Sequence, residues 1–429
     1  MFPGNKYICC NIAQLLKNYK INIYFFHDIV LENFSENHYI NETFRIALYA
    51  DKKTLAEMIK KIIKLILFSM GFFAGLFRRR KCTPLPRRIF ILASGYLGDT
   101  FWAVQTIHIL KQKYPNAELY FGGKPFISDL CYNLIPEEKQ IFIRSVISDR
   151  HRETVSFRNI FTESKFVREQ IKPDLLFDLV SNRYSALFAF RTGAYTVGMD
   201  CADEFYALYS FCAKQSGISS VHLAERPVSI VKQFLGMSGI SELQIFPPVP
   251  RCSKEKIYEK LSLKSDEKLI MLIPGAGWKT KRWNKEHFIT LGKILTEHGY
   301  RIILSGSPAE EALCNEISRG IKNSIVLCNS LAETISLLPH CKAAVGNDSG
   351  VAHLAASYGI KVFTLYCQTN PEFCGALGAD THYFRAVCPH TPGKGEHFCH
   401  GIPTLNCTRS ERMAIDPEPI AAELIKQLA

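Results

Sequence analysis

A regular alternation of short apolar runs with amphipathic stretches begins at residue 87 and constrains the fold more than any other feature. This pattern is typical of βα units, in which helices bury both faces of a parallel sheet. It predicts an α/β protein built from doubly wound parallel sheets. In the first half, strands are expected at 88–93, 117–121, 140–145, 174–180 and 194–199, with a helix at 100–113. In the second half, strands are expected at 268–274, 300–306, 324–328, 342–346 and 361–366, with helices at 284–298, from about 308, at 331–339 and after Ser349.

The stretch "LQIFPPVPRCS" at 243–253 interrupts this alternation with three prolines in four positions. Proline breaks regular structure and is common where domains are joined. We therefore expect two Rossmann-like domains, at 87–248 and 249–429, that face a cleft. Residues 1–86 form an extension before the first domain.

The extension contains an amphipathic stretch, "LAEMIKKIIKLILFSMGFFAGLFRRRK", at 55–81. Its first charged residues fall on one stripe of a helix, at Glu57, Lys60, Lys61 and Lys64. The apolar run that follows is too short for a comfortable membrane span. The pattern predicts a helix at about 55–77 that lies on an anionic membrane surface, and the alternative is a helix packed on the protein itself.

Net charge and cysteine usage narrow the choice of partner and compartment. The chain carries 52 Lys and Arg against 40 Asp and Glu, a formal charge of +12, which favours an anionic partner. Nucleic acid is the least favoured one, because no basic-aromatic surface or zinc-finger pattern is present. The 15 cysteines are mostly scattered, which favours a reducing compartment. Three Cys and three His at 388–407 are candidate zinc ligands, but the stretch lacks a C-x-x-C pair, so a structural loop is favoured.

The first candidate site follows the first predicted strand, in "ASGYLGDTFWAV" at 93–104. A glycine turn joins the strand to a helix and places Asp99 near the helix start. The stretch lacks G-x-G-x-x-G, which argues against an ordinary nicotinamide site. Asp99 is therefore either an N-cap or a carboxylate in the cleft that takes a proton from an acceptor hydroxyl.

The second candidate site is "PGAGWKTKRW" at 274–283, after the first strand of the second domain. Gly277 lies in a glycine turn beside Lys279 and Lys281. Backbone N–H groups and cations in one place suit a diphosphate, although the spacing is not that of a Walker A loop. The alternative is that these lysines are simply solvated.

The third candidate is "SGSPAEEALCNEI" at 305–317, where Glu310 or Glu311 lies in the first turn of a helix. An acidic residue in that position stabilises the helix dipole without any ligand. The functional alternative is a hydrogen bond to a ribose hydroxyl.

The fourth candidate is "VGNDSGVAHLAA" at 345–356. Its Gly-Asn-Asp-Ser-Gly run is similar to the nucleophile region of trypsin-like proteases, but those enzymes are all-β. A helix that begins near Ser349 would instead offer the N–H groups of Ser349, Gly350 and Val351 to an anion. Asp348 either binds sugar hydroxyls or caps the helix, and His353 either faces the cleft or fills a polar niche.

Together the four stretches resemble glycosyltransferase family 9, the ADP-heptose:lipopolysaccharide heptosyltransferase family, in their order and spacing. The resemblance covers about residues 87–425, and "VGNDSGVAHLAASYGIKVFTLYCQTNP" is its most specific part. It implies a GT-B fold with the donor nucleotide in the C-terminal domain, and a closing helix at about 417–428 that packs back toward the first domain. The chain departs from the family at Gly275–Gly277, where some members carry hydroxyl groups, and in residues 1–86.

The resemblance also implies roles for individual residues and a reaction. It makes Asp99 the general base, Lys281 a diphosphate contact, Ser349 and Gly350 the backbone cradle, Asp348 the sugar contact and Glu310 the ribose contact. The expected reaction is an inverting, metal-independent transfer of heptose from ADP-heptose to a lipopolysaccharide core or related glycolipid, without a cofactor. It would take place on the inner face of a bacterial cytoplasmic membrane. The alternatives are a different nucleotide-sugar donor, or a non-catalytic protein that binds nucleotide sugars or glycans.

Overall fold

The computed structural model describes residues 82–93, 95–145, 156–200, 203–214, 222–237, 243–386 and 413–429. The chain divides into two units between Arg79 and Arg80, and every described residue belongs to the second unit. The predicted helix at 55–77 and the Cys/His stretch at 388–407 lie outside the described residues. None of the helices in the described part is long and apolar enough to cross a membrane.

The first half forms a six-stranded sheet in the order β3-β2-β1-β4-β5-β6. All its strand pairs are parallel. Five of its strands were predicted, whereas β6 was missed because it has only three residues. The strands are β1 (Arg88–Leu92), β2 (Glu118–Gly123), β3 (Gln140–Phe142), β4 (Leu175–Asp178), β5 (Tyr195–Met199) and β6 (Phe211–Ala213).

The second half repeats this arrangement in a parallel sheet of order β12-β11-β10-β7-β8-β9. Its first strand, β7, lies in the middle of the sheet, and later strands are added on both sides of it. This is a doubly wound order of the Rossmann type. The predicted pair of doubly wound sheets is confirmed, and only β12 was missed. The strands are β7 (Lys268–Ile273), β8 (Tyr300–Ser305), β9 (Ile325–Leu327), β10 (Cys341–Asn347), β11 (Lys361–Tyr366) and β12 (Thr381–Arg385).

This strand order places two of the candidate loops at a switch point, where connections leave the sheet in opposite directions. In the second sheet the switch lies between β7 and β10, which are paired. The loops after these two strands are "PGAGWKTKRW" and "NDSG". In the first sheet β1 pairs with β4, and Asp99 follows β1. Ligands of open α/β sheets bind at such points, beyond the carboxyl ends of the strands.

Helices cover both sheets. In the first half these are α5 (Leu97–Lys113), α6 (Ile127–Leu130), α7 (Phe157–Phe166), α8 (Arg183–Thr192) and α9 (Glu225–Phe234). In the second half these are α10 (Lys254–Lys260), α11 (Lys285–Glu297), α12 (Glu311–Ser318), α13 (Leu331–Leu337), α14 (Gly350–Ser357), α15 (Pro371–Cys374) and α16 (Pro417–Leu428). Helix α5 begins three residues earlier than predicted.

Helices α5 and α14 contact each other and share one apolar core. Phe101 of α5 and Leu354 of α14 are fully buried members of the same cluster. The proline-rich segment predicted as a domain boundary is held on α5 as well, because Gln105 exchanges two hydrogen bonds with the backbone of Phe246 (N···O 2.8 and 3.3 Å). The boundary at 248/249 itself stays a prediction.

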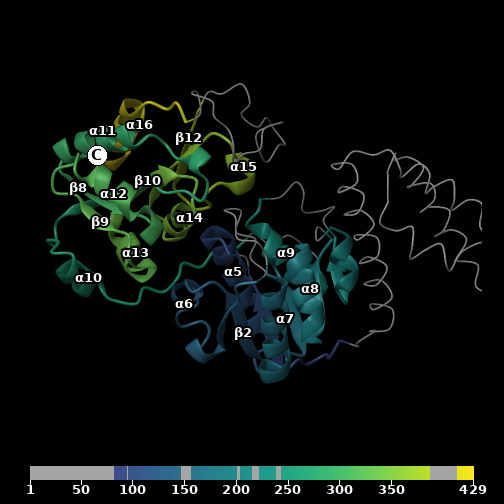
Figure 1. Ribbon diagram of the computed structural model, residues 1–429. Helices are drawn as coiled ribbons and strands as arrows, with labels where there is room; N and C mark the ends of the chain where they lie inside the picture. The colour runs from purple at the N-terminus through teal and green to yellow at the C-terminus, as the bar shows by residue number, and fades with distance from the viewer. Residues whose placement is uncertain are drawn as a thin grey trace, which may run out of the picture. The chain divides into compact units, whose positions relative to one another are not determined.

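The closing helix does not pack on the first half as expected. Helix α16 contacts α11 (Figure 1), and Ile420 and Leu424 are fully buried in the apolar cluster under the second sheet. The indole N–H of Trp283 donates to the carbonyl of Ile415 just before this helix (2.8 Å). The expectation drawn from the resemblance is therefore wrong for this chain, because the apolar face of α16 is used by its own domain.

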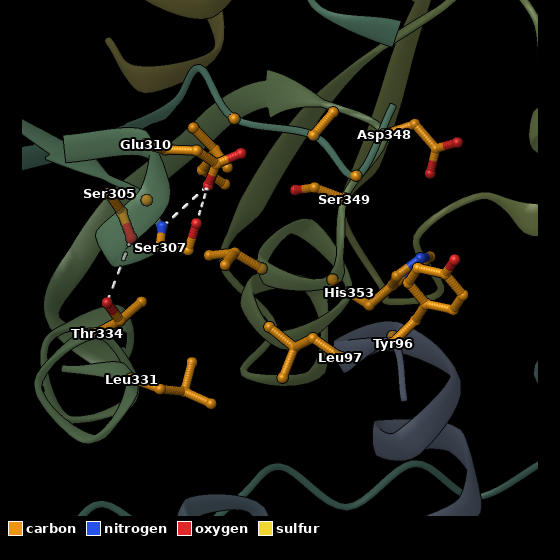
Figure 2. A pocket seen from close by; sticks show the side chains of 18 of the residues that line it. Tyr96, Leu97, Ser305, Ser307, Glu310, Leu331, Thr334, Asp348, Ser349 and His353 are labelled. Carbon is orange, nitrogen blue, oxygen red and sulfur yellow. Dashed lines mark hydrogen bonds between the residues drawn. The ribbon is translucent and has the colours of Figure 1, made fainter. Parts of the chain in front are cut away.

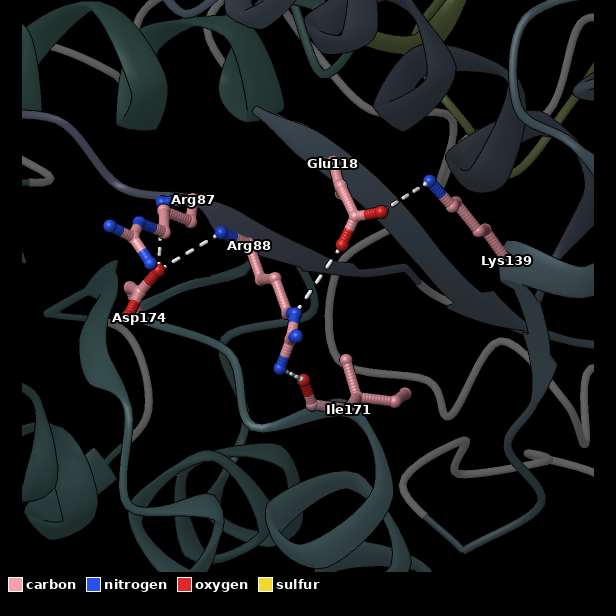
Figure 3. A network of polar contacts seen from close by, with 6 residues as sticks. All are labelled: Arg87, Arg88, Glu118, Lys139, Ile171 and Asp174. Atoms are coloured by element: carbon pink, nitrogen blue, oxygen red, sulfur yellow. Dashed lines mark hydrogen bonds and ion pairs between the residues drawn. The ribbon is translucent and has the colours of Figure 1, made fainter. Parts of the chain in front are cut away.

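Charged side chains connect the strands of the first sheet at the edge opposite the candidate loops (Figure 3). Asp174 accepts the backbone N–H groups of Arg87 and Arg88 (2.7 and 3.0 Å). The Arg88 side chain donates to the carbonyl of Ile171 and to Glu118, and Glu118 also accepts a hydrogen bond from Lys139. These bonds connect β1 to the strands on either side of it at this edge. The cysteines in the described part of the chain form no disulfide.

Candidate active site

A cavity of about 510 Å³ lies at the carboxyl ends of the strands and is lined by residues of both halves. Its size is that of an ordinary small-molecule site. All the predicted site residues line it except Lys279, which is exposed elsewhere on the same loop. The structure thus brings together Asp99, Gly277, Lys281, Glu310, Asp348, Ser349, Gly350 and His353.

Asp99 lies on the first-half wall of the cavity. It is the third residue of α5 and its side chain is exposed, whereas Tyr96, with extended backbone, is the N-cap. The N-cap interpretation of Asp99 is therefore wrong. Burial raises the pKa of the Cys374 thiol to about 12. The charges of Asp348 and Asp99 also raise this pKa, and that of Lys281 lowers it. These three charged groups line the same cavity.

Lys281 and Asp348 form an ion pair inside the cavity. Lys281 Nζ lies 2.5 Å from Asp348 Oδ2, and the same oxygen accepts the hydroxyl of Thr369 at 2.7 Å. Burial alone would raise the pKa of Asp348, but Lys281 and these hydrogen bonds outweigh it and hold that pKa below its ordinary value. Asp348 is therefore a buried carboxylate that depends on Lys281 for its charge.

The N-terminus of α14 opens into the cavity as predicted. Ser349 is the N-cap residue with extended backbone, and helix α14 begins at Gly350. Within the described part of the chain, the Ser349 hydroxyl is buried without a hydrogen-bond partner. Figure 2 shows Ser349 between Glu310 on one side and Asp348 on the other. A buried hydroxyl beside unpaired helix N–H groups suits an anionic ligand such as phosphate.

Gly350 allows α14 to approach α5 closely. A Cβ at this position would lie 2.7 Å from Leu97 Cβ and 2.8 Å from the backbone N of Gly98. Both distances are far below van der Waals contact, and the backbone of Gly98 cannot move without moving α5.

We expect Gly350→Ala to lower the free energy of unfolding by about 1–3 kcal/mol, the usual cost of overpacking. Alanine favours helices over glycine, so helix propensity alone predicts the opposite sign. Urea unfolding measures the difference. Gly277→Ala is the matched control, because its Cβ would meet nothing within 4 Å. Equal stability of both variants would show that α5 and α14 are not in tight contact.

Glu310 is held in place by its neighbours and also lines the cavity. It accepts the backbone N–H and the hydroxyl of Ser307 (2.9 and 2.8 Å), forming a capping box, and Arg282 lies 3.3 Å from its other oxygen (Figure 2 shows the Ser307 bonds). A Cβ on Gly275 would lie 2.3 Å from the Glu310 carboxyl carbon. The glycine at 275 is thus explained by the close approach of Glu310, and the ribose contact stays a prediction.

His353 is buried where α14 meets α5. Its ring lies 5.1 Å from that of Trp102, which also contacts the ring of His222 at 6.3 Å. Burial lowers the pKa of His353 to about 4. The negative charge of Asp348 raises this pKa, and the positive charge of Lys281 lowers it. Burial and the nearby His353 likewise lower the pKa of His222 to about 4. Both rings are therefore neutral at physiological pH, and His353 forms part of the cavity wall against Trp102.

These two histidines predict that stability falls in mild acid. Their folded pKa of about 4 lies below the ordinary value of about 6.5, so the unfolded state takes up protons first as the pH decreases. Between these values each histidine should lower the free energy of unfolding by at most about 1.4 kcal/mol per pH unit. Comparing the parent chain with His222→Gln by urea unfolding at pH 7 and pH 5 isolates one contribution, since groups common to both chains cancel. Parallel pH profiles would contradict the prediction.

Several residues of the cavity were missed by the sequence analysis. Leu223 and Thr369 line it, and the backbone N–H of Leu223 donates to the carbonyl of Phe373 (2.7 Å). Leu223 lies in no motif, whereas Thr369 lies in the stretch that resembles family 9 most specifically but was given no role there. Within the described ranges no group of three or more Cys, His, Asp or Glu side chains is placed to hold a metal ion. The Cys/His stretch at 388–407 lies outside the described ranges.

Comparison with known proteins identifies the family. The model of glycosyltransferase family 9 (heptosyltransferase) matches residues 168–397, more than half of the chain. The chain belongs to glycosyltransferase family 9. The matched residues include the candidate stretches at 274–283, 305–317 and 345–356, whereas the stretch with Asp99 at 93–104 precedes them.

Two members of family 9 show how similar individual relatives are to this chain. Lipopolysaccharide heptosyltransferase 2 of Escherichia coli K12 is 31% identical over 163 residues, which are 35% of this chain and 47% of that protein. Lipooligosaccharide heptosyltransferase 2 of Campylobacter jejuni is 24% identical over 296 residues, or 66% and 83%. The chain thus spans about half the length of the first of these relatives.

A solved structure shows the same fold. The structure of Escherichia coli ADP-heptose lipopolysaccharide heptosyltransferase II superposes with a TM-score of 0.64 at 21% identity, covering 80% of this chain and 98% of that one. The predicted GT-B architecture is therefore confirmed.

Proposed function

We propose that this protein transfers a heptose from ADP-heptose to the core of lipopolysaccharide or a related glycolipid. The observation that carries the proposal is the cavity in which Asp99 shares one region with the Lys281–Asp348 pair and the N-terminus of α14. Membership of family 9 supports a glycosyl transfer, and ADP-heptose is the donor named for a relative of the same fold.

The donor is proposed to lie along the second-half wall. The Ser349 hydroxyl and the N–H groups at the start of α14 would bind the diphosphate, together with the ammonium of Lys281, which has further N–H donors besides the one that faces Asp348. Gly277 would let the backbone approach closely, and Lys279 would add only long-range positive charge. Asp348 would bind sugar hydroxyls and Glu310 the ribose. The neutral ring of His353 would support the same wall.

The reaction is proposed to be a single displacement. Asp99 takes the proton of an acceptor hydroxyl while that oxygen forms a bond to the anomeric carbon of the donor. The bond from that carbon to the phosphate oxygen breaks, and the nucleotide diphosphate leaves with the electron pair. The configuration at the anomeric carbon is inverted. Lys281 and the helix N-terminus stabilise the growing phosphate charge, so the step needs no metal ion.

The acceptor requires a particular setting. A glycolipid acceptor places the enzyme on the inner face of the cytoplasmic membrane of a bacterium, and the net positive charge favours an anionic membrane surface. In this arrangement residues 87–248 hold the acceptor and residues 249–429 hold the donor, while the helix predicted at 55–77 attaches the extension to the membrane.

A donor panel tests the proposal. The full chain is incubated with ADP-heptose and with other nucleotide sugars, each with and without extracted glycolipid, and the released nucleotide is measured. The proposal expects acceptor-dependent release of ADP from ADP-heptose only. Release from another nucleotide sugar would support a different donor, and tight binding without any release would support a non-catalytic binding protein.

A further inference from the structure

Helix α7 carries exposed aromatic rings on the first half of the molecule. Phe157 and Phe161, one helical turn apart, are 57% and 45% exposed, while Ile160 and Ser164 of the same helix are buried. Phe166 at the end of α7 and Phe142 at the end of β3 are also about half exposed. Phenylalanine is normally buried, so large exposed rings on one helix indicate an interaction surface.

Cations accompany these rings. Arg158 and Lys165 are exposed on the same side of α7 as Phe157 and Phe161. The guanidinium of Arg191 on α8 lies 3.7 Å from the centre of the Phe161 ring. We call Phe157, Arg158, Phe161, Lys165 and Arg191 the α7 patch.

Two acidic residues near the patch, within the described part of the chain, are already engaged. Glu163 accepts the backbone N–H groups of Arg144 and Ser145 (both 3.1 Å) and the hydroxyl of Ser145. Glu169 pairs with Arg168 at 3.1 Å. The α7 patch is therefore aromatic and positively charged, without an acidic member of its own.

The α7 patch begins on the same edge of the sheet as Asp99. Helix α7 is the helix that follows β3, and α5 is the helix that follows β1, so both helices begin at the carboxyl edge of the first sheet. Figure 1 shows α7 beside α8, and the ring of Phe157 lies 6.1 Å from that of Tyr184 in the first turn of α8. A surface bound at the start of α7 would thus lie at the carboxyl edge of the first sheet, the edge that carries the cavity, although α7 and α5 pack on opposite faces of that sheet.

We propose that the α7 patch docks on an anionic phospholipid surface. Aromatic rings insert at the boundary between headgroups and acyl chains, and each nearby Lys or Arg adds attraction to anionic headgroups. The choice of a lipid partner rests on the proposed function, because a glycolipid acceptor requires contact with a membrane. The docking itself needs neither donor nor acceptor, so it is measured without the reaction.

The test places a fluorescent reporter in the α7 patch of the full chain. The three native tryptophans, Trp102, Trp278 and Trp283, are at most 6% exposed. Phe157→Trp therefore adds the one exposed indole of the described part of the chain. Its fluorescence is measured with vesicles of phosphatidylcholine and brominated phosphatidylglycerol, and with vesicles of brominated phosphatidylcholine alone. Tyr383→Trp is the matched control, because Tyr383 is equally exposed, at 57%, in the second half.

The proposal expects brominated phosphatidylglycerol to quench the indole of the Phe157→Trp chain strongly and the added indole of the Tyr383→Trp chain hardly at all. Adding Arg158→Gln and Lys165→Gln to the Phe157→Trp chain should raise the lipid concentration for half-quenching about fivefold per charge removed.

Two results would overturn the proposal. One is that the Phe157→Trp chain floats with the vesicles, and so is bound to them, while brominated lipid does not quench its indole at position 157. The other is an indole at position 157 that is shielded from aqueous acrylamide before any vesicle is added, which would mean that a protein segment covers the patch. Neither result depends on transfer activity, so failure of the docking and failure of the proposed function are told apart.

Discussion

Replacing Asp99 with asparagine should lower kcat by roughly 10²- to 10⁴-fold, the range expected for loss of a general base. The amide of asparagine has almost the same shape as the carboxylate but does not take up the acceptor proton. Asp99 lies on the first-half wall of the cavity, whereas the loops proposed to bind the nucleotide form its second-half wall. Affinity for ADP should therefore stay close to that of the parent chain, as measured by calorimetry.

Two controls make the Asp99 result specific. Asp99→Glu keeps the carboxylate on a longer side chain and should recover part of the lost rate, whereas Asp99→Ala should behave like Asp99→Asn. Thermal unfolding should hardly change in any of them, because the side chain is exposed. Turnover of Asp99→Asn at the parental rate would rule out the proposed base.

Replacing Lys281 with methionine should be costly for stability as well as for activity. Asp348 is only 7% exposed, and the variant would leave its carboxylate buried beside Thr369 without a cation. Loss of one partner of a buried ion pair costs on the order of 3–5 kcal/mol. The variant should also lose affinity for ADP, since the cation proposed to bind the diphosphate is gone. Urea unfolding and calorimetry measure the two losses separately.

The double variant Lys281→Met/Asp348→Asn separates charge burial from ligand binding. Asparagine keeps an acceptor for Thr369 and removes the unpaired charge, so most of the lost stability should return. Affinity for ADP should not return. If the double variant is no more stable than Lys281→Met, the ion pair seen in the cavity does not determine the stability of this region.

The fold was predictable because its signals are local in the sequence. Buried strands such as "KLIMLI" and "KVFTLY" are continuous apolar runs, and glycine turns separate them from the helices that follow. The strands that were missed, β6 and β12, are short or half-exposed and lack this pattern. The packing of α16 on α11 is a tertiary choice between two apolar surfaces, which a helical pattern alone does not encode.

The candidate site was predictable where a motif follows a strand at a switch point. Lys281 and Ser349 follow such strands directly and Asp99 lies in the first turn of the helix after β1, and the parallel sheets bring all three to one cavity. The pairing of Lys281 with Asp348 was not foreseen, because 67 residues separate them. Thr369 and His222 were missed for a similar reason, because each acts through a contact with another segment of the chain.

The central claim is that the cavity transfers a heptose, and the mass of the acceptor tests it most directly. The full chain, or its Asp99→Asn variant, is incubated with ADP-heptose and glycolipid extracted from bacteria that lack this protein, and the lipid is analysed by mass spectrometry. The account predicts that the parent chain adds one heptose per acceptor and releases an equal amount of ADP, and that the variant does neither. An acceptor of unchanged mass in the presence of bound, unconsumed ADP-heptose would contradict it.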